Sequence, residues 1–355
     1  MLVKRGLLNY KIGHTLFWLL RAELNYFDLS PSVVKVPKFY TRFAICLEMY
    51  LRGNSVHLPG IVKQVDLVNI LTSLKPLARL TAETHQIIFK NGDDLRQDML
   101  TLQVMRIMDA KWKIHNLDYC LTLYEVLPMG RNIGMIHVVQ NCQTLFQIQI
   151  SANQIGSALN MDNSLFNKYL YQCSSDSKQY MECVDRFTSS LAGYCIVTYI
   201  LGIKDRHQDN IMLAKDGRIF HIDFGHFLGH TKMKFGINRE RTEFILTEHF
   251  LHIVSRGKSN LKDTYEYKSF RESCVRGFLV LYHNARFFIV LFRMMLCMGL
   301  PELSTQNHID FITQSFMYDK TTEEAKTAFL NIFDGVVKSD WSTSVNWFFH
   351  AVKHL

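Results

Sequence analysis

Hydrophobic residues recur every three to four positions along most of the chain, which is the period of a helix with one apolar face. This pattern predicts helices over residues 6–26, 39–51, 61–74, 95–112 and 163–200, and a helical segment from 248 to 355. Short apolar runs predict strands instead, at 87–90, 120–126, 134–139 and 145–150. The pattern therefore predicts a small mixed sheet with one helix, accompanied by a larger and mostly helical part.

Two polar segments follow the helix that is predicted to end near residue 200. The first contains Asp205, His207 and Asn210, and the second contains Asp223 and His226. Mg²⁺ prefers oxygen ligands, and a nucleotide-bound Mg²⁺ needs them on neighbouring segments, so Asn210 and Asp223 are candidate metal ligands. Asp205, His207 and His226 are candidates for the group that accepts a proton from an attacking hydroxyl, and the sequence does not separate them. This arrangement is typical of phosphoryl transfer.

Composition indicates a globular chain with an anionic partner. The 355 residues are 48% hydrophobic and 20% charged, which is enough to build a sizeable core. The net charge of +8 favours a nucleotide, a phospholipid surface or another anionic partner. The eight cysteines show no C-x-x-C spacing and the first residues lack a signal-peptide layout, so a cytoplasmic chain with reduced thiols is expected. The apolar run 287–300 is too short to span a bilayer, so a buried helix is expected there.

Three motifs resemble the catalytic domain of the phosphoinositide 3-kinase family. They are Lys90-Asn-Gly-Asp-Asp-Leu-Arg-Gln-Asp98, Asp205-Arg-His-x-x-Asn210 and His221-Ile-Asp-Phe-Gly-His226. The order Asp-Arg-His is the reverse of the His-Arg-Asp of protein kinases. The resemblance implies a bilobal α+β fold of the phosphoinositide 3/4-kinase type. It implies helices of a helical domain over 1–36, a truncated N-lobe over 37–139 and a C-lobe over 140–355.

The resemblance also implies how ATP and Mg²⁺ are bound. Lys90 would neutralise the α- and β-phosphates, while Asn210 and Asp223 would ligate the metal. The other positions that match the family's nucleotide pocket are Ile88, Asp98, Tyr124, Ile136, Val138, Val139, Met212 and Ile222. The hinge would bond adenine through its backbone, so His137, where the family usually has Glu, would not prevent binding. By pattern alone, Lys90 is also compatible with an edge lysine and the apolar positions with a core.

The loop after Asp223 indicates the substrate. It carries Lys232, Lys234 and Arg239 and resembles the class I pattern, in which lysines face the phosphates of phosphatidylinositol 4,5-bisphosphate. Two lysines at i and i+2 can meet two phosphates as point charges. From charge alone, a loop of this kind is more often a solvated basic segment. The expected reaction is transfer of the ATP γ-phosphate to the inositol 3-hydroxyl.

The C-terminal stretch carries Trp341, Trp347 and Phe348, which suit either core packing or contact with a membrane. The resemblance favours the membrane, and with it recruitment from the cytoplasm to the inner face of the plasma membrane. It also implies an SH2-type regulatory adaptor and a small GTPase as partners, although the family's modules for binding them have no counterpart in this chain. No nucleic-acid partner is expected.

The interval before residue 87 departs from the family pattern. Only about a dozen residues separate the helix ending at 74 from the strand at 87–90, where the family has two strands and a phosphate-contacting turn. Residues 72–77 could be placed on that turn, but the unbroken helical period through 74 argues against it. The turn is therefore expected to be absent, which predicts weak ATP binding, an incomplete gene model or a splice product.

Two further departures lie near the catalytic residues. Lys204 stands where the family usually has Gly, so it would be strained if the position needs an unusual φ, and it could perturb the pKa of Asp205. Thr242 and Glu243 replace Val-Pro and add a negative charge near the expected lipid site. The alternative function is therefore a weakly active or inactive kinase-like module that binds membrane or regulatory partners.

Overall fold

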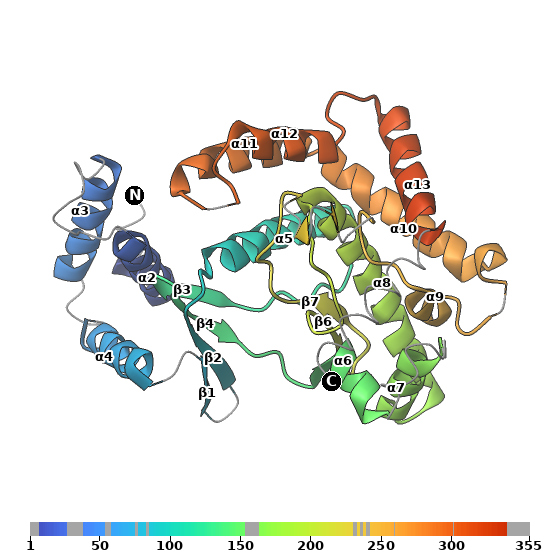
Figure 1. The fold of residues 1–355 in the computed structure, drawn as a ribbon, viewed down its shortest axis with the longest axis horizontal. Coiled ribbons are helices and arrows are strands. Elements are labelled where there is room, and N and C mark those ends of the chain that lie inside the picture. Colours follow the sequence, from blue (N-terminus) through green and yellow to red (C-terminus); the bar gives the residue numbers. More distant parts are fainter. Residues whose placement is uncertain are drawn as a thin grey trace. The chain divides into compact units, whose positions relative to one another are not determined.

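The computed structural model describes residues 7–26, 38–53, 58–74, 77–82, 85–152, 163–229, 233–234, 237–238, 242–258, 260–300 and 302–338. The chain divides into two compact units (Figure 1). The first is formed by Met1–Leu102 with Tyr124–Val139, and the second by Gln103–Leu123 with Gln140–Leu355. Helices predominate and the sheets are small, so the expected α+β class is confirmed.

The first unit combines helices with a four-stranded sheet. Its helices are α2 (Tyr10–Tyr26), α3 (Lys38–Gly53), α4 (Leu58–Leu74) and the start of α5 (Arg96–Ile114). The strands β1 (Leu77–Ala82), β2 (His85–Asn91), β3 (Val126–Gly130) and β4 (Ile133–His137) lie in the order β1-β2-β4-β3. All neighbouring pairs are antiparallel, so the prediction of a mixed sheet is wrong. The short β1–β2 and β3–β4 connections permit only antiparallel pairing, because a parallel pair needs a long crossover.

Alternation along β2 directs its side chains to two faces of the sheet. Phe89 is fully buried and joins one hydrophobic core with Phe17 and Trp18 of α2, Tyr50 of α3 and Met129 of β3. The described part of segment 1–36 therefore packs in the same core as the sheet. Its assignment to a separate helical domain stays a prediction.

The strand β1 was not expected from the sequence pattern. Helix α4 ends at Leu74 as predicted, but β1 begins soon after, at Leu77, and pairs with β2 along its whole length. Its sequence, Leu-Ala-Arg-Leu-Thr-Ala, alternates only weakly, so pairing with β2 specifies this strand more than local hydrophobicity does. Residues 75–76 and 83–84 lie outside the described residues, and the expected absence of a phosphate-contacting turn stays a prediction.

The second unit is mostly helical. Besides the rest of α5, its helices are α6 (Leu145–Ser151), α7 (Leu165–Cys173), α8 (Ser177–Leu201), α9 (Glu248–Val254), α10 (Tyr265–Tyr282), α11 (Ala285–Met295), α12 (Gln306–Ser315) and α13 (Thr322–Lys338). Short 3₁₀ helices span Leu261–Asp263 and Leu296–Met298. The strands β5 (Cys142–Thr144), β6 (Ile211–Ala214) and β7 (Ile219–His221) form an antiparallel sheet, and β8 (Met233–Lys234) pairs with β9 (Ile237–Asn238).

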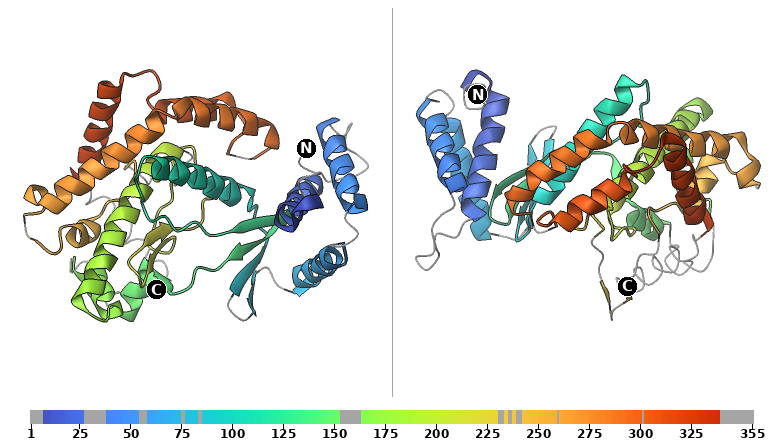
Figure 2. Two further views of the ribbon diagram at one scale, coloured as in Figure 1. Left: turned by 180° about the vertical axis from the view of Figure 1, so that it is seen from behind. Right: turned by 90° about the horizontal axis from the view of Figure 1, so that it is seen from above.

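Helix α8 is the centre of the second unit, where it contacts α7, α9, α10, α12 and β7 (Figure 2). Its last turns, from Ser190 to Leu201, are buried on every side. The polar groups inside this stretch are satisfied: the Tyr194 hydroxyl donates to the Thr122 carbonyl at 3.1 Å, and the Thr198 hydroxyl donates to the Tyr194 carbonyl at 2.7 Å. Because the end of α8 is held on all sides, the polar segment that follows starts from a fixed position.

Two strands predicted for this region are wrong. Residues 120–125 form no strand, and two of their carbonyls, those of Thr122 and Leu123, accept from the side chains of Tyr194 and Arg106. Residues 145–150 belong to helix α6, which begins with a capping box between Thr144 and Gln147. The Thr-x-x-Gln spacing signals a helix start, so the local signal was present in the sequence.

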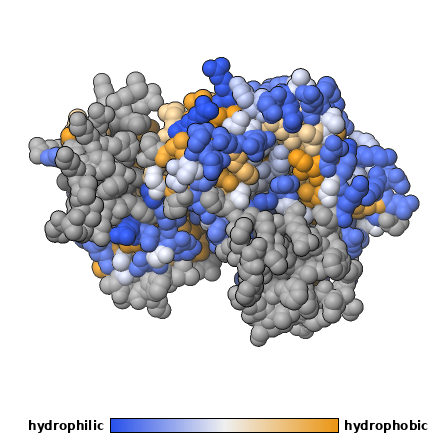
Figure 3. All heavy atoms as spheres, turned by 45° about the horizontal axis from the view of Figure 1, so that its top comes forward, coloured by the Kyte–Doolittle hydropathy of each residue, from blue (hydrophilic) through white to orange (hydrophobic). Residues whose placement is uncertain are grey.

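The expected helix is present as α11, and one of its faces is buried while the other is exposed. Phe288 and Phe292 are buried, whereas Phe287, Val290 and Met294 are exposed. Figure 3 turns the top of Figure 1, where α11 and α12 lie, toward the viewer; on this face apolar residues are interspersed with hydrophilic ones. Among the described residues, no single helix is long and apolar enough to cross a membrane; only α10 and α11 together, bent by 62°, meet that length and composition.

Candidate active site

Helix α8 leads into the polar segment through a left-handed glycine. Gly202 has a φ of 55°, which glycine adopts at little cost because it has no Cβ atom. A Cβ there would lie 2.3 Å from Cζ of Phe311 and 2.5 Å from the Gly229 nitrogen. This close approach allows backbone pairing with the segment after β7: Leu228 N–H donates to the Leu201 carbonyl at 2.7 Å, and Gly229 N–H to the Gly202 carbonyl at 3.1 Å.

The β6–β7 hairpin brings the two predicted metal ligands onto adjacent segments. Ile211 pairs with His221, and one residue further out Ile222 N–H donates to the Asn210 carbonyl at 3.0 Å. Asn210 therefore lies opposite Ile222, the residue directly before Asp223. The hairpin thus gives the proximity that their sequence positions suggested.

Arg206 fixes the backbone on both sides of this junction. Its guanidinium donates to the carbonyl of Lys204 at 3.0 Å, to that of Ile222 at 2.7 Å and to that of Asp223. The side chain is buried and lies over the Phe224 ring, with its central carbon 5.9 Å from the ring centre. Sequence reasoning gave Arg206 no role, although its place inside the Asp-Arg-His motif was a usable signal.

The two predicted site aspartates, the candidate catalytic residue Asp205 and the candidate metal ligand Asp223, both have a left-handed backbone with a φ of 60°. Aspartate and asparagine tolerate this region better than most residues, because their short side chains bond locally. The Asp223 side chain is exposed, and its Oδ1 accepts from Gly225 N–H at 3.4 Å. The left-handed turn therefore presents a carboxylate to solvent beside Asn210.

Asn210 fits the role of a Mg²⁺ ligand. Its buried amide is held by two contacts within the loop: Oδ1 accepts from His207 N–H at 2.8 Å, and Nδ2 donates to the Asp205 carbonyl. These bonds fix the orientation of the amide, and Oδ1 retains a second lone pair for a metal. Among the described residues, no three His, Cys, Asp or Glu side chains cluster closely enough to hold a metal ion. A pair of hard oxygen donors suits Mg²⁺, which takes its other ligands from phosphates and water.

Hydrogen bonds distinguish the two histidines. His207 Nδ1 accepts from Asp209 N–H at 3.3 Å, so the neutral ring carries its proton on Nε2 and can donate from there. His226 Nδ1 lies 3.1 Å from Oε1 of Glu302, whose Oε2 accepts from Phe227 N–H at 2.8 Å. A carboxylate at Nδ1 requires the proton on that nitrogen, which leaves Nε2 of a neutral His226 as an acceptor. Glu302 was missed because it lies 76 residues away in sequence.

His221, directly before the Ile-Asp-Phe-Gly residues, is a structural histidine. It is buried and stacks on Tyr194, with ring centres 4.8 Å apart. Burial, and then the nearby Arg206, lowers the pKa of His221 well below its ordinary value of 6.5. His221 is therefore neutral in the folded chain at neutral pH.

We expect the free energy of unfolding to fall as pH drops below about 6.5. The unfolded chain gains a proton on His221 there while the folded chain does not, and the full slope for one proton is about 1.4 kcal/mol per pH unit. Urea unfolding between pH 7 and 5 measures the slope, and His221→Phe should reduce it. His115→Gln, at an exposed histidine, is the control. Equal slopes in the His221→Phe and unaltered chains would contradict this assignment.

Several predicted nucleotide-binding residues share one face of the sheet in the first unit. Ile88 pairs directly with Ile136, and directly opposed residues in antiparallel strands project from the same face. Lys90 lies two residues beyond Ile88 and therefore on that face too. The Lys90 ammonium forms an ion pair with Asp93. The structure thus brings Ile88, Lys90 and Ile136 together opposite the side that Phe89 buries in the core.

Several other residues predicted to contact the nucleotide are buried or already form hydrogen bonds within the first unit. Val138 N–H donates to the Gln86 carbonyl at 2.9 Å, so Val138 offers its carbonyl rather than its N–H to a ligand. Asp98 and Tyr124 are buried, Asp98 in the first turn of α5 and Tyr124 just before β3. Val139 ends this unit. In the second unit, Met212 and Ile222 lie on one face of the β6–β7 hairpin, because Met212 pairs with Phe220, two residues before Ile222.

Lys204 does not have a positive φ, so the condition under which backbone strain was expected is not met. Of the non-glycine residues next to it, Asp205 has a positive φ. The Lys204 ammonium donates to the Thr242 carbonyl at 2.9 Å and lies 3.7 Å from Oε2 of Glu243. The two unusual charges in the sequence therefore pair with each other.

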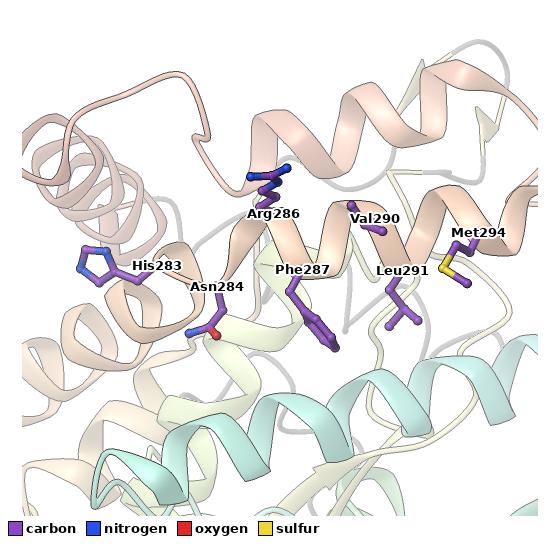
Figure 4. Close-up of a pocket in the computed structure, with 7 residues that line it drawn as sticks. All are labelled: His283, Asn284, Arg286, Phe287, Val290, Leu291 and Met294. Atoms are coloured by element: carbon purple, nitrogen blue, oxygen red, sulfur yellow. The ribbon is translucent and has the colours of Figure 1, made fainter.

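A groove runs along α11, separate from these residues. It is lined by His283, Asn284, Arg286, Phe287, Val290, Leu291 and Met294 (Figure 4). Phe287 points toward α5, and Lys111 Nζ lies 5.2 Å from the centre of its ring. None of the predicted site residues lines this groove.

Residues 84–305 match the sequence profile of the family described as "Phosphatidylinositol 3- and 4-kinase". The chain belongs to this family. It is 39% identical to phosphatidylinositol 3-kinase age-1 of Caenorhabditis elegans, in an alignment that covers 100% of this chain and 38% of the relative. It is 36% identical to phosphatidylinositol 3-kinase age-1 of Caenorhabditis briggsae, with 100% of the chain and 36% of the relative covered. The chain thus spans just over a third of the length of these relatives.

This member of the phosphatidylinositol 3- and 4-kinase family is shorter than its nematode relatives inside the aligned region. The alignment with the C. elegans relative extends over 446 positions, whereas the chain has 355 residues. About 90 positions of the alignment therefore have no residue in this chain. The brief interval between α4 and β2 predicts that some of these positions fall there.

The expected lipid and membrane contacts lie mostly outside the described part of this phosphatidylinositol 3- and 4-kinase chain. Lys232 and Arg239 lie outside it, as do Trp341, Trp347 and Phe348. Lys234 is the last residue of β8 and pairs with Ile237 through the backbone. These roles stay predictions.

Proposed function

We propose that the chain is the catalytic part of a class I-like phosphatidylinositol 3-kinase. It would transfer the γ-phosphate of ATP to the 3-hydroxyl of phosphatidylinositol 4,5-bisphosphate. The observation that carries this proposal is the junction at which Arg206 holds Asp223 beside Asn210, with Glu302 orienting His226 on the following residues. Family membership supports phosphate transfer to a phosphoinositide, and the basic loop supports the bisphosphate substrate.

In this mechanism, Asn210 Oδ1 and the Asp223 carboxylate would hold Mg²⁺. When bound, the ion neutralises charge on the β- and γ-phosphates. The buried loop contacts of Asn210 keep its amide oriented before any ligand arrives, and the three Arg206 bonds keep the Asp223 backbone in place. From the family resemblance, Lys90 is proposed as the cation for the α- and β-phosphates.

We assign the proton acceptor to His226 Nε2. The bond from the inositol 3-oxygen to the γ-phosphorus forms while the bond from that phosphorus to the β–γ bridging oxygen breaks, and ADP leaves. The proton of the 3-hydroxyl passes to His226, which Glu302 holds with its Nε2 available. His207 would instead donate from Nε2 to a phosphate oxygen, since its Nδ1 accepts a backbone N–H. Asp205 supports the loop through its carbonyl bond to Asn210.

The contacts with the lipid, the membrane and partner proteins are further parts of this proposal. Lys232, Lys234 and Arg239 would contact the phosphates of the head group, and Trp341, Trp347 and Phe348 would contact the bilayer. A chain acting on this lipid would be recruited from the cytoplasm to the inner face of the plasma membrane. An SH2-type adaptor and a small GTPase are proposed as partners from the family resemblance alone.

A second candidate is a weakly active or inactive module that binds membranes. The observation that favours it is the shortfall of about 90 aligned positions, together with the brief interval between α4 and β2. If the phosphate-contacting turn is absent, ATP would lose backbone donors that hold its phosphates.

The decisive experiment measures phosphate transfer by the purified chain. With Mg²⁺ and ATP, vesicles that contain phosphatidylinositol 4,5-bisphosphate should yield the 3-phosphorylated lipid, and vesicles that contain phosphatidylinositol alone should yield less product. Calorimetric titration of ATP should show binding that depends on Mg²⁺. Vesicle binding without phosphate transfer, and without Mg²⁺-dependent ATP binding at millimolar nucleotide, would support the second candidate and contradict the first.

A further inference from the structure

Lys204 connects three segments of the second unit. Its N–H donates to the His226 carbonyl at 3.0 Å, and its own carbonyl accepts from Arg206 at 3.0 Å. Its ammonium reaches the Thr242 carbonyl at 2.9 Å. The backbone of Lys204 is thus fixed to the catalytic loop and to the residues after Asp223, while its side chain holds the segment that begins at Thr242.

The ammonium contact is well shielded. The Lys204 side chain is only 12% exposed, and the Glu243 carboxylate, which is 57% exposed, lies 3.7 Å from its nitrogen. A charge-assisted hydrogen bond to a carbonyl is stronger than a neutral one, and shielding from water preserves that strength. The second charge lowers the cost of keeping a lysine partly buried, because the pair as a whole is neutral.

Thr242 and Glu243 begin a segment that is anchored to the helical core. Phe244 is buried against Phe333 of α13, with ring centres 6.0 Å apart, and Thr247 caps α9 by accepting from Phe250 N–H. The apolar contacts hold the segment from behind. Lys204 supplies the polar contact that ties its first residue to the catalytic loop.

We propose that Lys204 is a positioning residue that clamps the segment starting at Thr242 to the catalytic loop, with Glu243 as its charge partner. The clamp fixes the downstream end of the basic loop relative to Asp205 and His226. Its consequence for the lipid rests on the proposed function, whereas the clamp itself does not. The two departures in charge, at positions 204 and 243, are therefore one compensated feature.

The clamp is tested first without any assay of catalysis. In hydrogen–deuterium exchange, Lys204→Met should raise the exchange rate of peptides covering residues 242–251 by roughly tenfold, the factor that corresponds to about 1.4 kcal/mol. Lys204→Arg, which keeps a charged donor, should restore most of the protection, and Glu243→Gln should cause a smaller rise. The backbone-bonded amides of Leu228 and Gly229 give an internal reference that should change little.

A matched control is Lys258→Met. Lys258 lies in the same unit and forms an ion pair with Glu266 at 2.6 Å, away from the bonds that Lys204 makes. In this variant, the amides near Thr242 should exchange at the same rate as in the unaltered chain. Equal exchange in Lys204→Met and the unaltered chain would overturn the proposal.

A lipid assay then tests what the clamp does. Lys204→Met should raise the KM for vesicles containing phosphatidylinositol 4,5-bisphosphate severalfold and leave the KM for ATP unchanged. An equal rise in both KM values would overturn the assignment to lipid positioning. If the unaltered chain transfers no phosphate, the proposed function fails, and the exchange experiment still decides whether the clamp exists.

Discussion

Asp223→Asn is expected to reduce phosphate transfer by roughly a thousandfold. The substitution removes one negative oxygen from the proposed metal site, and metal stabilisation of transition-state charge is worth several kcal/mol, of which each 1.4 kcal/mol is tenfold in rate. Asparagine keeps the shape of the side chain and tolerates the φ of 60°, so the fold should survive. The Arg206 contact goes to the backbone carbonyl of residue 223 and is also retained.

The measurement is kcat with saturating lipid, together with Mg²⁺-dependent ATP binding by calorimetry. Asp216→Asn is the control, because Asp216 lies in the β6–β7 turn and pairs with Arg218 at 2.8 Å. That variant should lose less than twofold in kcat. Transfer that survives in Asp223→Asn would count against Asp223 as a metal ligand.

Glu302→Gln is expected to lower kcat by roughly 10- to 100-fold, the usual cost of losing a group that orients a functional side chain. An amide can present its NH₂ to His226 Nδ1, which favours the tautomer with the proton on Nε2 and removes the proton acceptor. The KM for ATP should stay unchanged, because the two carboxylate oxygens of Glu302 face His226 Nδ1 and Phe227 N–H. Glu323→Gln, at an exposed glutamate of α13, should have no effect.

A double mutant separates an orienting role from general destabilisation. If Glu302 acts through His226, then His226→Gln with Glu302→Gln should be no slower than His226→Gln alone. Multiplied losses would show that Glu302 supports the fold independently of His226. The melting temperature of each variant should be measured beside the rates.

The first unit shows where sequence patterns stopped being informative. Helix α4 was predictable to Leu74 from its helical period, whereas β1 was not, since its residues alternate weakly and depend on pairing with β2. The segment 120–125 shows the same limit, because side chains of Tyr194 and Arg106, distant in sequence, use carbonyls of Thr122 and Leu123. The helix at 145–150 was instead signalled locally, by the capping box between Thr144 and Gln147.

The sequence by itself determined the family and the α+β class. It also indicated the candidate site, because spacing along one polar segment and one hairpin brings Asp205, Asn210 and Asp223 near each other. Tertiary structure decided the contacts made across long separations. Glu302 reaches His226, and Lys204 reaches Thr242 and Glu243, through packing of elements that local pattern does not relate. Hydrophobic periodicity reports which face of an element is buried, but the partners of a polar side chain are fixed only when the elements are packed.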